Sequence, residues 1–183
     1  MKTLILTLGC LLCGHLLYSQ LETPPMPRLA YCVKTKSLKR ADLKNTFPFN
    51  KTTKIQLVSF KPDYESMPMK NGSIDTTTFI ETKTLKRKEE DRLINILYNY
   101  NFDPKVNKDS IVLETMVCYE PRNAVIFKNK QNEIISYLEI CFQCLQHRKP
   151  SDLRTGDFCQ DKYSLLKTYF GQMGIKFGIT ELE

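Results

Sequence analysis

The sequence predicts an α+β fold, an antiparallel sheet of about four or five strands with two main helices packed on it. Runs rich in Val, Ile, Phe and Tyr, bounded by turn residues, predict the strands. Apolar residues at three- and four-residue spacing in 86–100 and 159–173 predict the helices. No expected strand is followed by a Gly-rich phosphate loop, which argues against a doubly wound nucleotide-binding sheet.

The first two strands are expected at residues 54–60 and 74–85. "KIQLVSF" has the alternation and β-branched content of a strand, and "IDTTTFIETKTL" is rich in Thr and Ile, which suit a pleated sheet. The Asn71-Gly72 pair between them is a turn signal.

The strongest β signal is a hairpin over residues 116–142. Two apolar runs flank the polar turn "NKQN". Pairing Asn129 with Asn132 places Lys128 opposite Glu133 and sets the register of the whole hairpin.

The helix predicted over 86–100 presents an apolar face and carries acidic residues near its start, where the helix dipole favours them. The helix over 159–173 ends near Gly171 and Gly174. A shorter helix is expected over 37–45. Residues 145–158, "LQHRKPSDLRTGDF", are expected to form a long polar loop.

Three regions are expected along the chain: a signal peptide (1–19), an extended proline-rich leader (20–30) and a single α+β domain (31–183). The first region has a charged start, a short apolar run and a small residue at its end, as secretory signals do. No second apolar run follows, so no transmembrane segment is expected after signal removal. Export to a periplasm, an outer-membrane surface or the medium follows, and lipoprotein anchoring at Cys10 is less favoured because Thr7 stands where Leu is usual.

Signal removal leaves a basic chain with one histidine. Lys2 leaves from a total of 27 basic residues against 20 acidic ones. Of seven cysteines, Cys10 and Cys13 leave, and His15 is one of two histidines. Because His147 is then the only histidine, a His-rich zinc site and an H-E-x-x-H protease are excluded. No catalytic set is recognisable.

The remaining cysteines are expected to gather at the open end of the hairpin. In the favoured register Cys118 is a diagonal neighbour of Cys141 on one sheet face. Cys144 follows at C-x-x-C spacing, and Cys159 begins the second helix and could return to the same point. Cys32 is then the spare thiol.

Three interpretations compete for this cluster. As a staple, Cys159 bonds Cys144 or Cys141. As a metal site, the four thiolates, or three with His147 as substitute ligand, would hold zinc as the alternative cofactor. As a redox site, C-x-x-C should begin a helix, whereas here it ends a strand. An oxidising compartment ranks the staple first.

Two sets of basic residues are candidate anion contacts. Arg122 could bind an anion, or pair with Glu139, which the favoured register places opposite it. The basic segment 34–54, with Lys36, Lys39 and Arg40, could contact an anionic envelope surface. Nucleic acid is not favoured as a partner, since aromatic residues are sparse there and the chain has no Trp.

The stretches "CYEPRNAVIFKNKQNEIISYLEICFQC" and "FCQDKYSLLKTYFGQMGIKFG" carry a resemblance. Their C-Y-x-P-R, I-C-F-x-C and F-C pattern resembles an uncharacterised group of small exported proteins from Bacteroidetes-type bacteria. The resemblance implies an envelope setting and treats Cys118, Cys141, Cys144, Cys159 and Arg122 as one cluster. It supplies no activity. Asn123 stands where the group is expected to have His.

The sequence therefore predicts an exported, non-catalytic binding or structural domain stapled by disulfides. The alternatives are a zinc- or thiol-dependent protein using the cysteine cluster, and an anionic-surface binder using residues 34–54.

Overall fold

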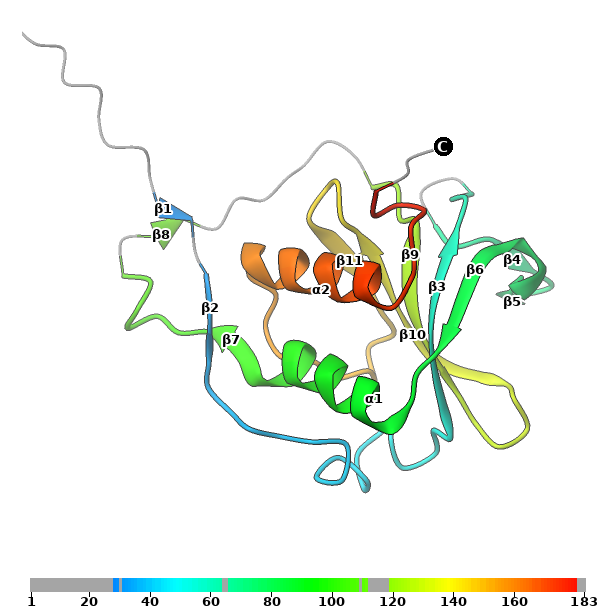
Figure 1. Cartoon of the computed structure of the whole chain (residues 1–183), viewed down its shortest axis with the longest axis horizontal. Helices are drawn as coiled ribbons and strands as arrows, with labels where there is room; N and C mark the ends of the chain where they lie inside the picture. The colour runs from blue at the N-terminus through cyan, green and yellow to red at the C-terminus, as the bar shows by residue number, and fades with distance from the viewer. Residues whose placement is uncertain (1–27, 30, 64–65, 109, 112–118, 181–183) are drawn as a thin grey trace, which may run out of the picture.

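The computed structural model describes residues 28–29, 31–63, 66–108, 110–111 and 119–180. It has an α+β architecture built on a five-stranded antiparallel sheet (Figure 1), in the order β11-β10-β9-β3-β6. These strands are β3 (Lys54–Phe60), β6 (Phe79–Thr84), β9 (Asn123–Lys128), β10 (Ile134–Cys141) and β11 (Gln146–Arg148).

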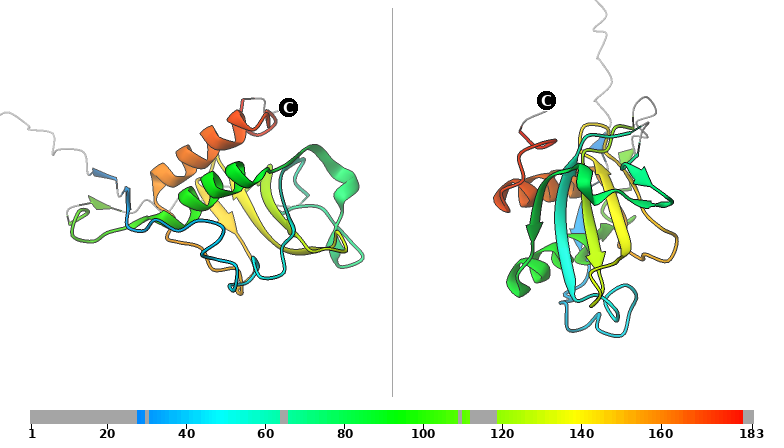
Figure 2. Two further views of the ribbon diagram at one scale, coloured as in Figure 1. Left: turned by 60° about the horizontal axis from the view of Figure 1, so that its bottom comes forward. Right: turned by 90° about the vertical axis from the view of Figure 1, so that its right-hand side faces the viewer.

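Two α-helices cover one face of this sheet (Figure 2). Helix α1 (Arg87–Ile94) runs directly into a π-helix, η2 (Asn95–Asn99), and α2 (Gln160–Gln172) lies beside them. The Tyr169 hydroxyl of α2 donates a hydrogen bond to the Glu89 carbonyl of α1, at 2.7 Å. This contact joins the two helices into one layer.

Three short strand pairs extend from this body. Strand β1 (Arg28–Leu29) pairs in parallel with β8 (Ser110–Ile111), and β2 (Cys32–Lys34) pairs antiparallel with β7 (Tyr100–Phe102). Strands β4 (Met69–Lys70) and β5 (Ser73–Ile74) form a hairpin, followed by the 3-10 turn η1 (Thr76–Thr78). The two residues between β4 and β5, Asn71 and Gly72, have φ of 52° and 75°, as a type I′ hairpin turn requires.

The central strands bury both of their faces, because side chains alternate along a strand. Ile55, Leu57, Val125 and Phe127 face the helices and form the main core with Leu166 and other residues of α1, η2 and α2. The opposite face packs a smaller core of Val58, Phe60, Met67, Ala124 and Ile126. No helix in the described part of the chain is both long and apolar enough to span a membrane.

The predicted fold class is confirmed, as are the strand at 54–60 and the second helix. Four local predictions are wrong at least in part. Residues 40–45 form turns rather than a helix, and 37–39 have no regular structure. Within the expected strand 74–85, Thr76–Thr78 form η1 and strand β6 begins at Phe79. The expected loop 145–158 contributes strand β11, and the expected helix 86–100 becomes π-helical at Asn95 and ends at Asn99. The expected signal region 1–19 and the expected leader up to residue 27 lie outside the described residues.

The hairpin forms with a different register from the predicted one. Lys128 lies opposite Ile134, and a bulge between Ile134 and Ser136 shifts the pairing further, so that Ala124 lies opposite Glu139. A bulge adds a residue to one strand only, which pairing counted outward from the turn does not include.

Candidate functional site

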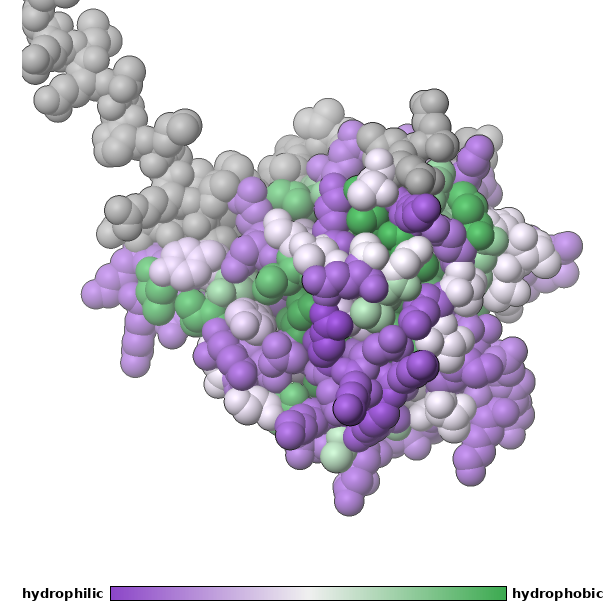
Figure 3. Space-filling view, viewed as in Figure 1, coloured by the Kyte–Doolittle hydropathy of each residue, from purple (hydrophilic) through white to green (hydrophobic). Residues whose placement is uncertain are grey.

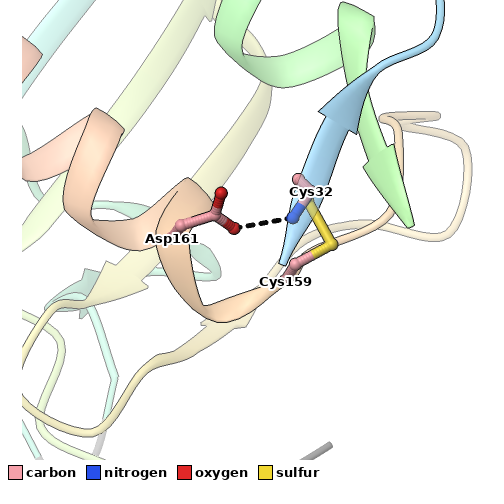
Figure 4. Close-up of side chains that lie close together, drawn as sticks. All are labelled: Cys32, Cys159 and Asp161. Carbon is pink, nitrogen blue, oxygen red and sulfur yellow. Dashed lines mark hydrogen bonds between the residues drawn. A yellow bond between two sulfur atoms is a disulfide. The ribbon is translucent and has the colours of Figure 1, made fainter. Parts of the chain in front are cut away.

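A disulfide joins Cys32 of β2 to Cys159, the N-cap residue of α2 (Figure 4). Their Cα atoms lie 5.4 Å apart, and the two residues are separated by 127 positions in the sequence. The Asp161 carboxylate, in the first turn of α2, accepts a 2.8 Å hydrogen bond from the Cys32 amide. The predicted bond from Cys159 to Cys141 or Cys144 is therefore wrong, and Cys32 is not a spare thiol.

The same three side chains form a possible metal-ligand group. One ligand atom each from Cys32, Cys159 and Asp161 lies within 4.8 Å of the others, the one such group among the described residues. Both sulfur atoms are already bonded to each other, so this group could offer thiolates to a metal only after reduction.

The other described cysteines lie at the end of β10. Cys141 is a free, buried thiol whose sulfur accepts a 3.2 Å hydrogen bond from the Cys144 amide. Cys144 is disulfide-bonded, and Cys118 lies outside the described residues. The predicted four-cysteine cluster is thus divided, because Cys159 is held by Cys32.

Among the described residues, His147 belongs to no group of side chains that could hold a metal. Its ring stacks on Phe158, with ring centroids 3.7 Å apart, and its Nδ1 lies 2.8 Å from the Tyr163 hydroxyl. Burial, with smaller contributions from Lys149 and Lys162, lowers the pKa of His147 to about 4. His147 is therefore neutral near pH 7 and packs beneath α2.

Arg122 has a different partner from the one predicted. It pairs with Glu120 at 2.9 Å and donates a longer hydrogen bond to Gln143. Glu139 is buried and accepts hydrogen bonds from the Met67 amide and the Tyr119 hydroxyl, at 3.0 and 3.2 Å. The expected Arg122–Glu139 pair fails because the register places Ala124 opposite Glu139.

The disulfide fixes one end of a segment that we call the strap, residues 31–40. The middle of the strap is held by Asn99, the last residue of η2, which is 1% exposed. The Asn99 side chain accepts from the Leu38 amide at 2.8 Å and donates to the Leu38 carbonyl at 3.0 Å. Its own carbonyl accepts from the Thr35 amide at 2.7 Å. These hydrogen bonds hold the backbone of the strap against η2.

A groove of about 390 Å³ opens between the strap and the α1–η2 helices. Figure 3 shows mostly hydrophilic residues around α1. The groove is lined by Lys34, Ser37, Leu38, Lys39, Asp91, Arg92, Asn95, Ile96 and Asn99.

The charged side chains of the groove are mainly basic. Lys34 and Lys39 are exposed, and Arg92 lies over the Tyr169 ring and donates to Gln172. Asp91 is the single acidic residue of the lining; it accepts from the Arg40 amide at 2.8 Å and pairs with Arg87 at 3.9 Å. The Asp91 carboxylate is therefore already bound by the Arg40 amide and by Arg87.

Of the predicted anion contacts in the basic segment, only Lys39 lines the groove. Lys36 is exposed and does not line the groove. Arg40 instead donates to the Phe49 and Thr52 carbonyls, at 2.9 and 3.0 Å, and its guanidinium lies over the Phe49 ring. Arg40 therefore fixes the turns of residues 41–52, and burial lowers its pKa.

The helical wall of the groove was missed from the sequence. The expected helix over 86–100 was described by its apolar face and its early acidic residues, and Arg92, Asn95 and Asn99 were not singled out. The pattern that could have found them is the Asn95–Asn99 pair, whose four-residue spacing places both amides on one face. Their side chains do meet, with Asn99 Nδ2 donating to Asn95 Oδ1 at 2.9 Å.

A buried lysine supports the π-helix from behind. The Leu97 carbonyl accepts hydrogen bonds from the Gly156 amide and from the Lys162 ammonium, at 2.9 and 3.1 Å. Lys162 is fully buried, which lowers its pKa to about 8. A cation here is stabilised by the carbonyl end of the helix. A Cβ at Gly156 would lie 1.9 Å from the Asn101 side-chain oxygen and 3.0 Å from the Leu97 carbonyl, so a larger residue there would displace the Asn101 side chain.

Comparison with known proteins finds no matching family model, no matching curated protein and no matching solved structure. The site is therefore interpreted from its own chemistry.

Proposed function

We propose that this protein is an exported domain, stapled by disulfides, with a non-catalytic binding or structural role. The observation that carries the proposal is the bond between Cys32 and Cys159, which fastens the strap to α2. Such bonds persist in oxidising compartments and are rare where thiols are kept reduced. The signal-like character of residues 1–19 and the resemblance to small exported proteins support the same setting.

A binding role is favoured over a purely structural one by the construction of the groove. Its two walls come from distant parts of the sequence, and the disulfide and Asn99 hold them together. His147 is buried against Phe158 and Tyr163, which supports a packing role for the one histidine of the expected mature chain.

The alternative is a zinc- or thiol-dependent protein. It is supported by the closeness of the Asp161 carboxylate to the two bonded sulfur atoms. In this alternative the working state is reduced, and Cys32, Cys159 and Asp161 hold the metal.

The test uses the full chain expressed in a bacterium that can export it. Thiols of the denatured protein are alkylated with iodoacetamide, before and after reduction, and the labelled peptides are identified by mass spectrometry. We expect a new N-terminus near residue 20, with Cys32 and Cys159 labelled only after reduction and Cys141 labelled without it. A retained N-terminus, or Cys32 and Cys159 labelled without reduction, contradicts the proposal. Zinc retained in the native mass spectrum together with these free thiols selects the alternative.

A further inference from the structure

We propose that the groove between the strap and the α1–η2 helices binds an organic phosphate, a phosphate monoester attached to a small apolar group. The phosphate lies at Lys34 and Lys39, and the apolar group lies on Leu38 and Ile96. This inference rests on the proposed binding function and names its ligand class.

Charge is the first argument. The lining carries three basic side chains and one acidic one, Asp91, which already pairs with Arg87. A phosphate monoester carries about −1.5 to −2 charge near pH 7, which matches this excess better than a carboxylate does. Within the described part of the chain, the Lys34 and Lys39 ammonium groups form no ion pair, so both are available to a ligand.

The lining also offers neutral contacts. The Ser37 hydroxyl and the Asn95 amide can donate hydrogen bonds to phosphate oxygens. Leu38 and Ile96 supply apolar surface beside these groups. A volume of about 390 Å³ falls within the range of small-molecule sites. Inorganic phosphate would leave the apolar surface uncovered, which favours a ligand with an apolar group.

The geometry of the walls is the second argument. Three lining residues, Asn95, Ile96 and Asn99, belong to the π-helix η2. The Leu97 carbonyl of η2 is held by Lys162 and Gly156, and the strap is held by Asn99 and the disulfide. A site held in this way loses little conformational entropy on binding.

The experiment is a titration of the full-length, oxidised protein with phenyl phosphate, followed by ¹⁵N-NMR and isothermal calorimetry. Inorganic phosphate and phenol serve as the two half-ligand controls. We expect shifts in residues 34–39 and 91–99, and binding several-fold tighter than that of either control. Shifts confined to other regions, or equal binding of phenyl phosphate and inorganic phosphate, would overturn the proposal.

A matched pair of variants tests the lysines. The double variant Lys34→Gln/Lys39→Gln removes two exposed charges from the lining, and Lys44→Gln/Lys51→Gln removes two exposed charges outside both the lining and the strap. We expect about tenfold weaker binding in the first variant and unchanged binding in the second. Equal weakening in both would show a general charge effect and refute the site.

The same chemistry is offered by soluble organic phosphates and by lipid headgroups. Sedimentation with phosphatidic acid vesicles, but not with phosphatidylcholine vesicles, and its loss in Lys34→Gln/Lys39→Gln would identify the lipid source. Phenyl phosphate binding without sedimentation would identify a soluble ligand.

The thiol state is measured on the same sample: an intact disulfide without phenyl phosphate binding refutes the groove ligand alone. Free Cys32 and Cys159 thiols refute the stapled domain itself.

Discussion

Asn99 is the side chain on which the position of the strap most depends. It is buried and bonds both backbone groups of Leu38. We expect Asn99→Ala to lower the free energy of unfolding by about 2–3 kcal/mol, because it leaves polar groups without partners. Urea denaturation measures this. Asn45→Ala, at an exposed turn position, is the control and should change stability by less than about 0.5 kcal/mol. Similar losses in the two variants would contradict this role.

The buried Lys162 should make the free energy of unfolding change with pH in the alkaline range, between about pH 8 and 10.5. Its pKa is about 8 in the folded protein, against an ordinary value of 10.5 for a solvated lysine. Between these values the unfolded chain binds a proton that the folded protein has released, so stability rises with pH. We expect the wild type to gain about 2–3 kcal/mol over this window relative to Lys162→Met. Chemical denaturation at a series of pH values measures the gain.

The comparison with Lys162→Met is needed because tyrosines act in the opposite direction. Burial raises the pKa of Tyr98, Tyr163 and Tyr169, so these groups reduce stability above about pH 10. Both proteins share this loss. Parallel stability curves for the two proteins would show that the buried ammonium does not titrate as expected.

His147 should make the free energy of unfolding change with pH in the acid range. Its pKa is about 4 in the folded protein, against an ordinary value of 6.5, so the unfolded chain binds the extra proton between these values. The stability from neutral His147 is complete above pH 6.5 and is lost as the pH falls through 4. We expect His147→Gln to flatten the stability profile between pH 6.5 and 4, measured by thermal unfolding. An unchanged slope would place the titrating group elsewhere.

At the scale of elements, the disulfide is the main constraint on the strap. In the chain-entropy treatment a closed loop of this length contributes about 5 kcal/mol. We expect the Cys32→Ala/Cys159→Ala variant to lose about this much stability in urea denaturation. Cys141→Ala, which removes a free buried thiol, should lose less than this. A loss below about 1 kcal/mol in the double variant would show that hydrogen bonds alone hold the strap.

The elements predicted most closely are those whose local pattern and tertiary surroundings agree. Strand β3 and helix α2 bury the faces that their sequences present. The expected helix at 37–45 does not form: the Leu38 amide bonds the Asn99 side chain, and the Arg40 side chain of the same segment bonds the Phe49 and Thr52 carbonyls. Strand β11 was missed because its polar residues pair with β10 at the sheet edge, where no alternation of apolar residues is required.

The site was predicted less well than the fold, for a physical reason. The cysteines were grouped by the predicted hairpin register, with Cys159 returning to the end of that hairpin, whereas the observed bond joins Cys159 to Cys32, 127 positions away. Its geometry depends on how β2 pairs with β7, which the local pattern of residues 31–40 does not specify. The basic composition of the strap was visible, but the helical wall that completes the groove was not.

At the scale of the molecule, breaking the disulfide should loosen the groove, because the disulfide holds the strap that forms one of its walls. The strap lies outside the five-stranded sheet and is fixed by the disulfide, the short β2–β7 pair and Asn99. We expect reduction to increase hydrogen exchange at 32–38 and at the groove-lining part of η2, while β3 and β9 remain protected. Phenyl phosphate binding should weaken in the same samples. Uniform exchange across strap and sheet would show that the molecule unfolds as one unit.

The bond between Cys32 and Cys159 also makes most of the chain a covalent ring. Strands β3, β6, β9, β10 and β11 and helix α1 all lie within the closed loop. A protease that cuts one peptide bond at the turn of Asn71 and Gly72 would therefore open the ring without releasing a fragment. The nicked protein would migrate as a single species without reductant and as two fragments with it. Such a cut chain would keep its two parts covalently joined, so the strands on either side of the cut could stay paired.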